Sequence, residues 1–212
     1  MTDTFPGSIG FSEGLFDQRP ILIAVAGPNG AGRSTFYQAH LRPGGLPFVN
    51  ADVLAAGLKL DAYAAAKIAD RTRRELVDRG ESFVFETVFS DPAGEKIDFL
   101  KAAALAGYTV ILLFIGISGP ELSDTRVAMR VAQGGHDVPQ HKLVDRYLRS
   151  LRNLRFALSS LEHVYIIDNS NLRQPFRLIA HFESGVPVAI QKPVPLWLAE
   201  VLDQEGSGES DE

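Results

Sequence analysis

The fold is decided by Ile21-Leu22-Ile23-Ala24-Val25-Ala26-Gly27-Pro28-Asn29-Gly30-Ala31-Gly32-Arg33-Ser34-Thr35. Residues 21–26 are uniformly apolar, which is typical of a strand buried on both faces in the middle of a parallel sheet. Residues 27–35 follow the phosphate-binding pattern G-x-x-x-x-G-K-[ST], except that Arg33 stands in place of lysine. Because residues 36–41 can continue as a helix, the order of strand, glycine loop and helix predicts backbone N–H groups that converge on phosphate oxygens.

This Walker A loop, or P-loop, predicts a nucleotide site that takes ATP or GTP with Mg²⁺. The serine hydroxyl of the pattern is the expected Mg²⁺ ligand, here Ser34. A glycine-rich turn without a ligand is the alternative, and the full spacing and context argue against it. The predicted phosphate-binding residues are Gly27, Pro28, Asn29, Gly30, Ala31, Gly32, Arg33, Ser34 and Thr35.

Arg33 is the departure from the pattern. A loop lysine reaches the β and γ phosphates as a compact ammonium, whereas a guanidinium is larger, planar and differently directed, so the exchange is not conservative at a tight site. We expect Arg33 to weaken or abolish phosphoryl transfer while permitting nucleotide binding. The substitution is either a natural divergence or a deliberate change.

Length and composition predict one soluble domain. The chain has 212 residues and 45% hydrophobic residues, enough for one substantial core. No apolar run reaches the roughly 18 residues of a membrane span, and residues 1–19 do not resemble a secretion signal. The absence of cysteine excludes disulfides and thiolate metal sites, and it is compatible with a cytoplasmic protein.

The charge balance argues against nucleic acid as a partner. The net charge is −5 and the pI is near 5.6, so a broad basic footprint for DNA or RNA is not expected. An anionic substrate must then be bound by a local basic cluster, and one exists between residues 126 and 155. Residues 204–212 are acidic and lack apolar anchors, and we expect a disordered tail there.

Segments typical of strands and helices alternate along the rest of the chain. Such alternation predicts an α/β three-layer sandwich, with a mostly parallel sheet of five or more strands and helices on both faces. In the expected helix 60–79, the apolar face comprises Leu60, Ala64, Ile68 and Leu76. The other expected strands are 46–50, 82–85, 108–115 and 163–167, with a hairpin over 176–182 and 186–190; the other expected helices are 92–106, 118–134, 137–160 and 197–202.

Two acidic segments are expected at the same edge of this sheet as the P-loop. Asp52 follows the second strand, and Glu86 and Thr87 follow the third; ligands of open parallel sheets bind at these carboxyl ends. Phosphoryl transfer needs a carboxylate that orients the acceptor hydroxyl and takes its proton. Asp52 fits this base, and Glu86 could bind acceptor hydroxyls or order a Mg²⁺-bound water. The alternative for Asp52 is a cap of the following helix.

Basic residues then recur at helical spacing. Arg126 and Arg130 are one turn apart, and Lys142, Arg146 and Arg149 repeat the spacing on the next helix. Such clusters are usually solvated helix faces. They occupy the position in chain order where nucleotide kinases carry a lid, which favours a phosphate contact for Arg126 and Arg130. His136, in the loop between the two helices, could touch a substrate phosphate or lie in solvent.

The motifs together resemble the zeta-toxin family of P-loop kinases over about residues 20–180. The resemblance rests on the P-loop and on its order with the four segments Val49-Asn50-Ala51-Asp52, Phe85-Glu86-Thr87-Val88-Phe89-Ser90, Gly134-Gly135-His136-Asp137-Val138-Pro139 and Asp168-Asn169-Ser170. It implies a single P-loop kinase domain over residues 1–203, with a helical lid over about residues 118–160.

The resemblance also implies an activity and residue roles. In such enzymes the γ-phosphoryl group of ATP or GTP is transferred to the sugar of a UDP-N-acetylhexosamine. The residue matching Asp52 is the base, the residue matching Glu86 holds the amino sugar, and an arginine matching Arg130 acts on the phosphates. A second lid arginine of the family falls nearest His136, which departs from the pattern. Family members are commonly toxins restrained by a small antitoxin protein.

Other functions remain open from the sequence. A stand-alone kinase for a different small molecule is one, and a catalytically impaired nucleotide-binding protein that acts through a partner is another. A GTPase switch is weaker, because residues 91–94 have D-x-x-G spacing but no N-K-x-D segment follows. A transport or helicase ATPase would need additional modules. The adenine pocket is not identified, and Asn169 is only a guess at its location.

Overall fold

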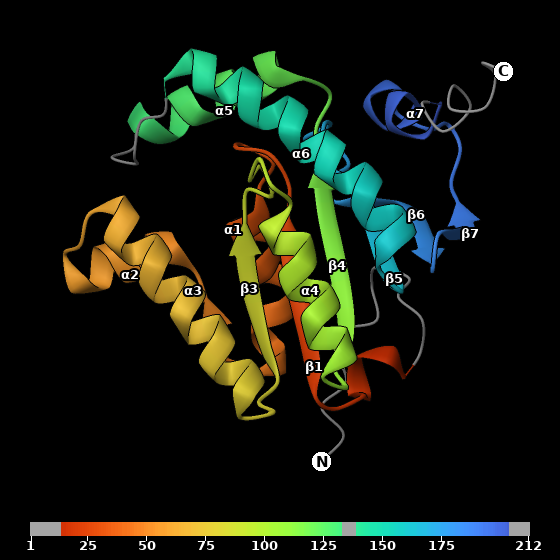
Figure 1. Cartoon of the computed structure of the whole chain (residues 1–212). Coiled ribbons are helices and arrows are strands. Elements are labelled where there is room, and N and C mark those ends of the chain that lie inside the picture. Colours follow the sequence, from red (N-terminus) through yellow and green to blue (C-terminus); the bar gives the residue numbers. More distant parts are fainter. Residues whose placement is uncertain (1–13, 133–138, 204–212) are drawn as a thin grey trace, which may run out of the picture.

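The computed structural model describes residues 14–132 and 139–203. In these residues seven strands form one sheet in the order β2-β3-β1-β4-β5-β6-β7 (Figure 1). Strands β1 to β5 are parallel to one another, whereas β6 and β7 add an antiparallel hairpin at one edge. The strands are β1 (Ile21–Ala26), β2 (Phe48–Val49), β3 (Phe83–Thr87), β4 (Thr109–Gly116), β5 (His163–Asp168), β6 (Arg177–Glu183) and β7 (Val186–Ile190).

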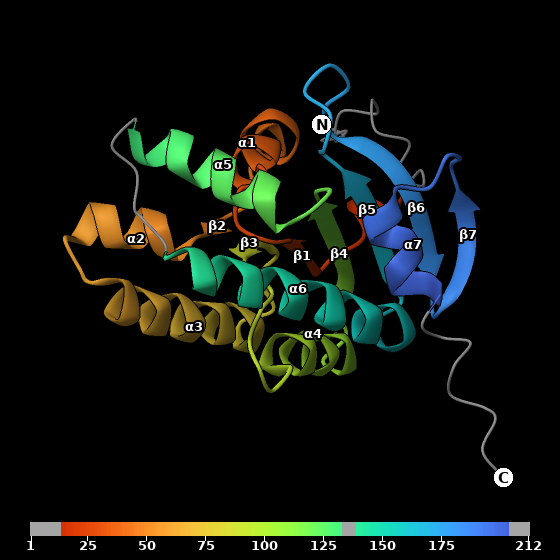
Figure 2. The same cartoon turned by 90° about the horizontal axis from the view of Figure 1, so that it is seen from above.

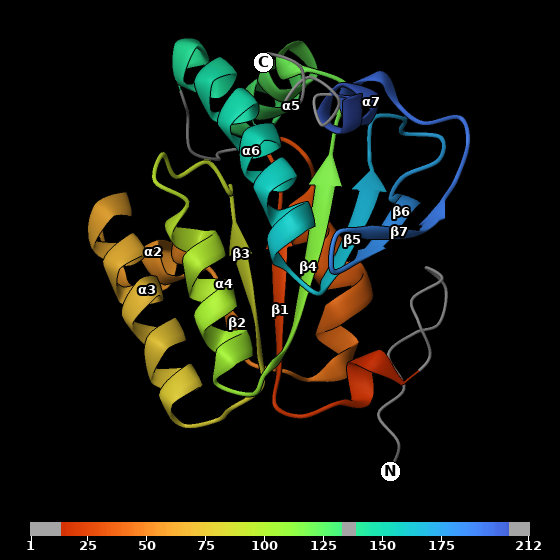
Figure 3. The same cartoon turned by 45° about the vertical axis from the view of Figure 1, so that its right-hand side comes forward.

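Helices cover both faces of the sheet, as the α/β prediction required. Seen from above, α1 and α5 lie on one side of the central strands, and α3, α4 and α6 lie on the other (Figure 2). Figure 3 shows α3, α4 and α6 in front of the sheet. The α-helices are α1 (Arg33–Phe36), α2 (Ala51–Leu58), α3 (Ala62–Asp78), α4 (Glu95–Leu105), α5 (Pro120–Ala132), α6 (Gln140–Ser160) and α7 (Leu196–Asp203). None of the helices in the described ranges combines the length and apolar character needed to cross a bilayer.

The buried residues form one apolar layer on each side of the sheet. All six residues of β1 are buried, and their side chains alternate between the two layers. Phe83, Phe85 and Phe114 anchor the layer beneath α3, α4 and α6. Phe36 and Tyr165 anchor the other layer, beneath the short helices around residues 15–17 and 33–41. Strand β1 is therefore the centre of the core, as its continuous apolar run predicted.

The expected apolar face of the helix 60–79 is wrong at Ile68, whereas Leu76 packs against the core as expected. Helix α3 buries Ala65, Ala69 and Arg73 instead, and Ile68 is 37% exposed. The reason is Arg73, whose guanidinium lies over the Phe85 ring at 5.0 Å from its centroid. This contact and the small alanines turn the helix so that a cation faces the sheet, which a count of apolar residues does not anticipate.

Local signals fix where the helices begin and end. The Asn50 side chain accepts from the backbone N–H groups of Asp52 and Val53 at the start of α2, and Asp61 caps α3 in the same manner. Gly80, at a φ of 67°, ends α3 as expected from the sequence. The helix after the P-loop is shorter than a continuous α-helix, because Tyr37–Leu41 forms a π-helical turn.

Candidate active site at the phosphate loop

The P-loop leaves the carboxyl end of β1 between β3 and β4, where the strand order switches sides. Gly27, Gly30 and Gly32 have φ values of 140°, 72° and 89°, which favour glycine. A Cβ on Gly27 would overlap the backbone carbonyl of Ile115 on β4. The loop is therefore pressed against the sheet at its start, and Gly32 caps α1, whose first residue is Arg33.

Glu86, at the end of β3, is the hub of the polar contacts around the loop. Its Oε2 accepts from the Ser34 hydroxyl at 2.8 Å and from the Asn50 amide at 2.7 Å. Its Oε1 lies 3.4 Å from Nε of Arg33. The carboxylate side chain is only 6% exposed, so these three polar neighbours replace the water it lost on folding.

The Arg33 guanidinium lies against the loop itself. Its side chain is 9% exposed, and one terminal nitrogen donates to the Gly27 carbonyl at 2.8 Å. Burial lowers the pKa of Arg33, while the charges of Glu86 and Asp52 act in the opposite direction. Arg130 and Arg146 lie close enough to lower the pKa of Arg33 further, so three cations gather beside the loop.

Asp52 lies in the first turn of α2 and is exposed. The alternative that it caps this helix is wrong, because Asn50 provides the cap through hydrogen bonds of 2.7 Å and 3.2 Å. The Asp52 carboxylate faces a cleft and acts electrostatically on Arg33. Its position leaves it available to a bound hydroxyl.

Two clefts meet at the P-loop. The first, about 590 Å³, runs along the loop beneath α5, and the second, about 190 Å³, lies between β3, α2 and α3. Arg33 and Glu86 line both clefts. The first is also lined by Gly30, Gly32, Ser34, Thr35, Arg126, Met129, Arg130, Asn169, Leu172, Pro175 and Phe176, and the second by Asn50, Ala51, Asp52, Ala66, Ala69, Arg73, Thr87, Val88 and Lys96.

Helix α5 closes over the first cleft. The buried Ser123 hydroxyl donates to the Asn29 carbonyl at 2.7 Å, and Arg126 donates to the Gly30 carbonyl at 3.3 Å. Burial lowers the pKa of Arg126, and Asp168 counteracts this effect. Of the predicted lid arginines, Arg126 thus touches the loop backbone, and Arg130 lines the same cleft one turn further along.

Helix α6 departs from the expectation of a solvated basic face at Arg149, whereas Lys142 is exposed as expected. Arg149 donates to the Ser90 carbonyl at 2.9 Å, and Ser150 and Asn153 bind the carbonyls of Val88 and Phe89 at 2.7 Å and 3.1 Å. These bonds hold the segment that follows β3. The carboxyl half of α6 is therefore a support for the position of Glu86 and Thr87.

Three further predicted residues have different outcomes. The Asn169 side chain donates to the Ala31 carbonyl at 2.8 Å and is 6% exposed, so it braces the P-loop besides lining the first cleft. Thr87 lines the second cleft and accepts from the Phe89 backbone at 3.1 Å. His136 and the motif Gly134 to Val138 lie outside the described residues, as does the predicted tail 204–212.

Sequence reasoning missed several residues at the site. The sequence assigns Asn50 no role beyond its place in the motif at residues 49–52, yet its side chain caps α2 and donates to Glu86. Arg73 and Lys96 line the second cleft, and Phe176 lines the first against Gly32. The signal available for Asn50 was its N-cap position before α2, whereas Arg73 and Phe176 reach the site only through tertiary packing.

Asp70, beside the second cleft, contributes to the stability of the fold, and this contribution depends on pH. Partial burial raises the pKa of Asp70, but the hydrogen bond from Arg73 and the charge of Lys96 outweigh it and lower the pKa to about 2. Since the pKa falls on folding, the stabilisation is complete above pH 3.8 and is lost as the pH falls toward 2. Because Asp70 is 39% exposed, we expect about 1 kcal/mol after solvent screening.

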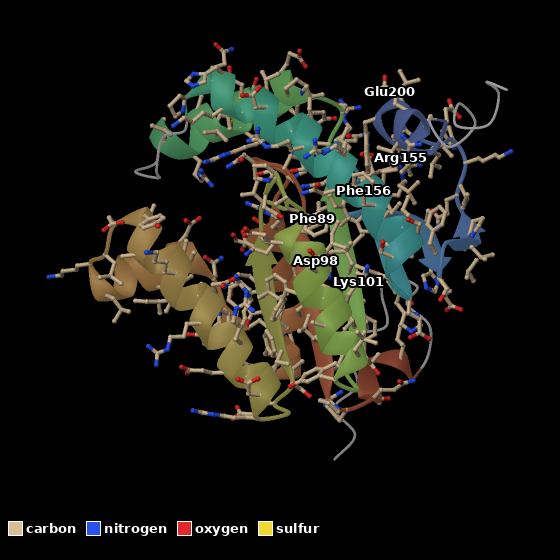
Figure 4. All side chains as sticks on the ribbon, in the orientation of Figure 1. Phe89, Asp98, Lys101, Arg155, Phe156 and Glu200 are labelled. Carbon is tan, nitrogen blue, oxygen red and sulfur yellow. The ribbon has the colours of Figure 1, made fainter. Side chains whose placement is uncertain are left out.

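We predict that Asp70→Asn removes this loss of folding stability at acid pH. The thermal midpoints of the original and variant proteins should differ by a few degrees at pH 6 and converge near pH 2. Asp98→Asn, on the exposed side of α4, is the matched control (Figure 4). A difference between Asp70→Asn and the original protein that stays constant from pH 6 to pH 2 would contradict the assignment.

A larger hollow lies away from the P-loop. It measures about 730 Å³ between α6 and α7, beside Arg155, Phe156 and Glu200 (Figure 4). None of the predicted site residues lines it. Because the phosphate loop, the carboxylates and the arginines converge elsewhere, chemistry favours the two smaller clefts as the active site.

One family model and several solved structures match this chain. The family model described as Zeta toxin matches residues 59–174, more than half of the chain; the P-loop itself precedes the matched segment. The sequence matches no curated protein.

Solved structures share the fold. Chains of the AvrRxo1-ORF1:AvrRxo1-ORF2 complex with sulphate ions and with ATP both align at a TM-score of 0.67, with 19% and 18% identity. The alignments cover 94% and 93% of this chain and 69% and 67% of those chains. A chain of the PezAT toxin–antitoxin system of Streptococcus pneumoniae aligns at 0.58, with 17% identity, over 98% of this chain and 84% of that one. At these identities the likeness shows a shared fold and nothing further.

Proposed function

Because this chain belongs to the zeta toxin family, we propose that it transfers the γ-phosphoryl group of ATP or GTP to a hydroxyl of a UDP-N-acetyl amino sugar. Family and fold support a nucleotide-dependent phosphotransferase. The observation that carries the proposal is the pair of clefts that meet at Arg33 and Glu86. A donor beneath α5 and an acceptor beside Asp52 would face each other across these two side chains.

The proposed roles follow from position. The P-loop backbone and α5 would hold the donor phosphates, and the γ-phosphoryl group would lie near Arg33 at the junction of the clefts. The oxygen of the acceptor hydroxyl would attack the γ phosphorus, and Asp52 would take the proton of that hydroxyl. The bond between the γ phosphorus and the β-γ bridging oxygen would break at the same time. Arg130 and Arg126 would stabilise the charge on the transferring group, and Glu86 and Thr87 would contact the amino sugar.

The described residues fit Mg²⁺. The Ser34 hydroxyl and the Glu86 carboxylate lie 2.8 Å apart at the mouth of the loop, and such hard oxygen donors are the ligands that Mg²⁺ prefers. Ser34 would hold the ion directly, and Glu86 through water. When bound, Mg²⁺ would neutralise charge on the β and γ phosphates. Helices α5 and α6, within the proposed lid over about residues 118–160, would exclude water from the site.

A small antitoxin protein is a proposed partner, because the AvrRxo1 and PezAT chains come from toxin–antitoxin or two-protein complexes. The second candidate function is a catalytically impaired nucleotide-binding protein. Arg33 favours it, since its guanidinium is held by the Gly27 carbonyl and Glu86 instead of projecting freely as a lysine would.

We predict that Arg33→Lys increases the rate of phosphoryl transfer about tenfold, because a flexible ammonium can reach the γ phosphate that the tethered guanidinium does not. Both forms are incubated with ATP, Mg²⁺ and a panel of UDP-sugars, and products are identified by mass spectrometry. The expected product is a UDP-N-acetyl amino sugar heavier by one phosphoryl group.

The control is the same incubation without an acceptor, which measures ATP hydrolysis. No mass gain on any UDP-sugar would refute the substrate class, and equal rates in both forms would refute the role of Arg33. Nucleotide binding without turnover in both forms would favour the impaired nucleotide-binding protein. Turnover confined to a different hydroxyl compound would indicate a kinase for another small molecule.

A further inference from the structure

Three potential metal ligands gather where the start of β5 pairs with the end of β6. His163 begins β5 and is in register with Glu183, while His181 lies two residues before Glu183 on β6. Residues two apart on a strand share a face, so all three side chains lie on the same side of the sheet. One ligand atom from each lies within 4.8 Å of the others.

The cluster is distant from the proposed catalytic site. The strand register aligns Ala26, just before the P-loop, with Phe114 and then with Ile166. His163 is level with Ile111, toward the amino ends of the parallel strands. The three ligands therefore lie at the opposite end of the sheet from the phosphate loop, and they do not depend on the kinase proposal.

Two imidazole nitrogens in this cluster are buried without a hydrogen-bond partner among the described residues. They are Nδ1 of His163 and Nε2 of His181, and His181 is only 5% exposed. A buried polar atom without a partner costs about 1–3 kcal/mol, so an unexplained pair in one place indicates a missing partner. Both nitrogens face the same carboxylate, with Oε1 of Glu183 at 3.8 Å from His163 and 3.5 Å from His181.

The surroundings orient the two rings. Tyr165 stacks on His181 with ring centroids 4.0 Å apart and an interplanar angle of 6°. Oε1 of Glu162 lies 3.8 Å from Nε2 of His163, the nitrogen on the far side of that ring. This distance is too long for a hydrogen bond, and the Glu162 side chain is 72% exposed. A hydrogen bond from a metal-bound histidine to such a carboxylate would fix the ring and its tautomer.

We propose that His163, His181 and Glu183 bind a divalent transition-metal ion of the zinc type. Zinc bonds to nitrogen and oxygen are about 2.1 Å long, so tetrahedral ligand atoms lie about 3.4 Å apart. The Glu183 oxygen lies near this distance from both nitrogens, at 3.5 Å and 3.8 Å. The three ligand atoms lie within 4.8 Å of one another, so a bound ion would draw the side chains closer together. Two imidazoles and one carboxylate leave a fourth position for water. The ion joins the last parallel strand to the antiparallel hairpin and stabilises the pairing of β5 with β6.

The test uses the full chain, freed of metal with a chelator and titrated with ZnCl₂ in a calorimeter. We expect one tight site and a rise in the thermal midpoint with Zn²⁺. Glu183→Gln and His163→Gln should each weaken Zn²⁺ binding by at least about tenfold and reduce the rise in midpoint. Both side chains are partly exposed, and circular dichroism checks that each variant folds.

His141→Gln, at an exposed position of α6, is the matched histidine control, and Ser34→Ala is the control for metal held at the nucleotide site. Both should keep the Zn²⁺ affinity of the original protein. Cobalt(II) titration should give the strong visible absorption of a four-coordinate ion in the original protein but not in Glu183→Gln. The proposal would be overturned if the original protein did not bind Zn²⁺, or if both ligand variants kept its affinity. It would also be overturned if either control lost as much Zn²⁺ affinity as the ligand variants.

Discussion

Asp52→Asn, made in the Arg33→Lys form, is expected to reduce kcat for phosphoryl transfer by about 10²- to 10⁴-fold, the usual contribution of a general base. The amide has nearly the shape of the carboxylate but cannot take the proton of the acceptor hydroxyl. Asp52 is exposed in the first turn of α2 and is not its N-cap, so the variant should fold normally. Nucleotide affinity should stay within about twofold, because Asp52 lines the second cleft and not the first.

The measurement is single-turnover transfer from ATP to the acceptor, together with equilibrium nucleotide binding. Asp98→Asn, on α4, removes a carboxylate of the same kind away from the clefts and should leave kcat unchanged (Figure 4). If Asp52→Asn retained transfer within about twofold, Asp52 would not be the base. A parallel loss of nucleotide affinity would instead indicate an effect of its charge on Arg33.

Glu86→Ala is expected to lower the free energy of unfolding by about 3–5 kcal/mol, the usual effect of removing one member of a buried ion pair. It would leave the buried Arg33 guanidinium without its carboxylate, and the Ser34 hydroxyl and Asn50 amide without their acceptor. For a domain of this size we expect the thermal midpoint to fall by roughly 10 °C.

Denaturant unfolding monitored by circular dichroism measures this loss. Glu86→Gln keeps an oxygen acceptor for Ser34 and Asn50 but removes the charge, so it should be intermediate. Glu75→Ala is the control, because its ion pair with Arg71 is exposed and should contribute less than about 1 kcal/mol. Equal destabilisation by Glu86→Ala and Glu75→Ala would show that Glu86 is not a hub of buried contacts.

The α/β fold class and the family resemblance, both predicted from the sequence, are confirmed by the sheet and by the Zeta toxin match. These predictions succeeded because they depend on local patterns: a continuous apolar run in β1, the glycines after it, and alternation of strand and helix segments. The lengths of the elements were less predictable. The second strand is reduced to Phe48–Val49, since Asn50 already caps the next helix.

The face of α3 shows why local patterns fail elsewhere. Four-residue spacing predicted a face through Ile68, whereas the helix turns Ala69 and Arg73 inward. The choice depends on the Phe85 ring and on Asp70, which hold the guanidinium. The pattern of apolar residues along the helix does not predict either partner of Arg73. It records neither a cation–π contact nor a partly buried ion pair.

By itself, the sequence determined the P-loop, the order of strands and helices, and which carboxylates follow which strands. Each of these features depends on residues that are close together in the chain. Only the tertiary structure decided that Ser34, Asn50 and Arg33 share Glu86, which is 52 and 36 residues from the first two. It alone brought His163 beside His181 and Glu183. Such groupings depend on strand order and register, which are set by burial of the whole sheet and by no single segment of the chain.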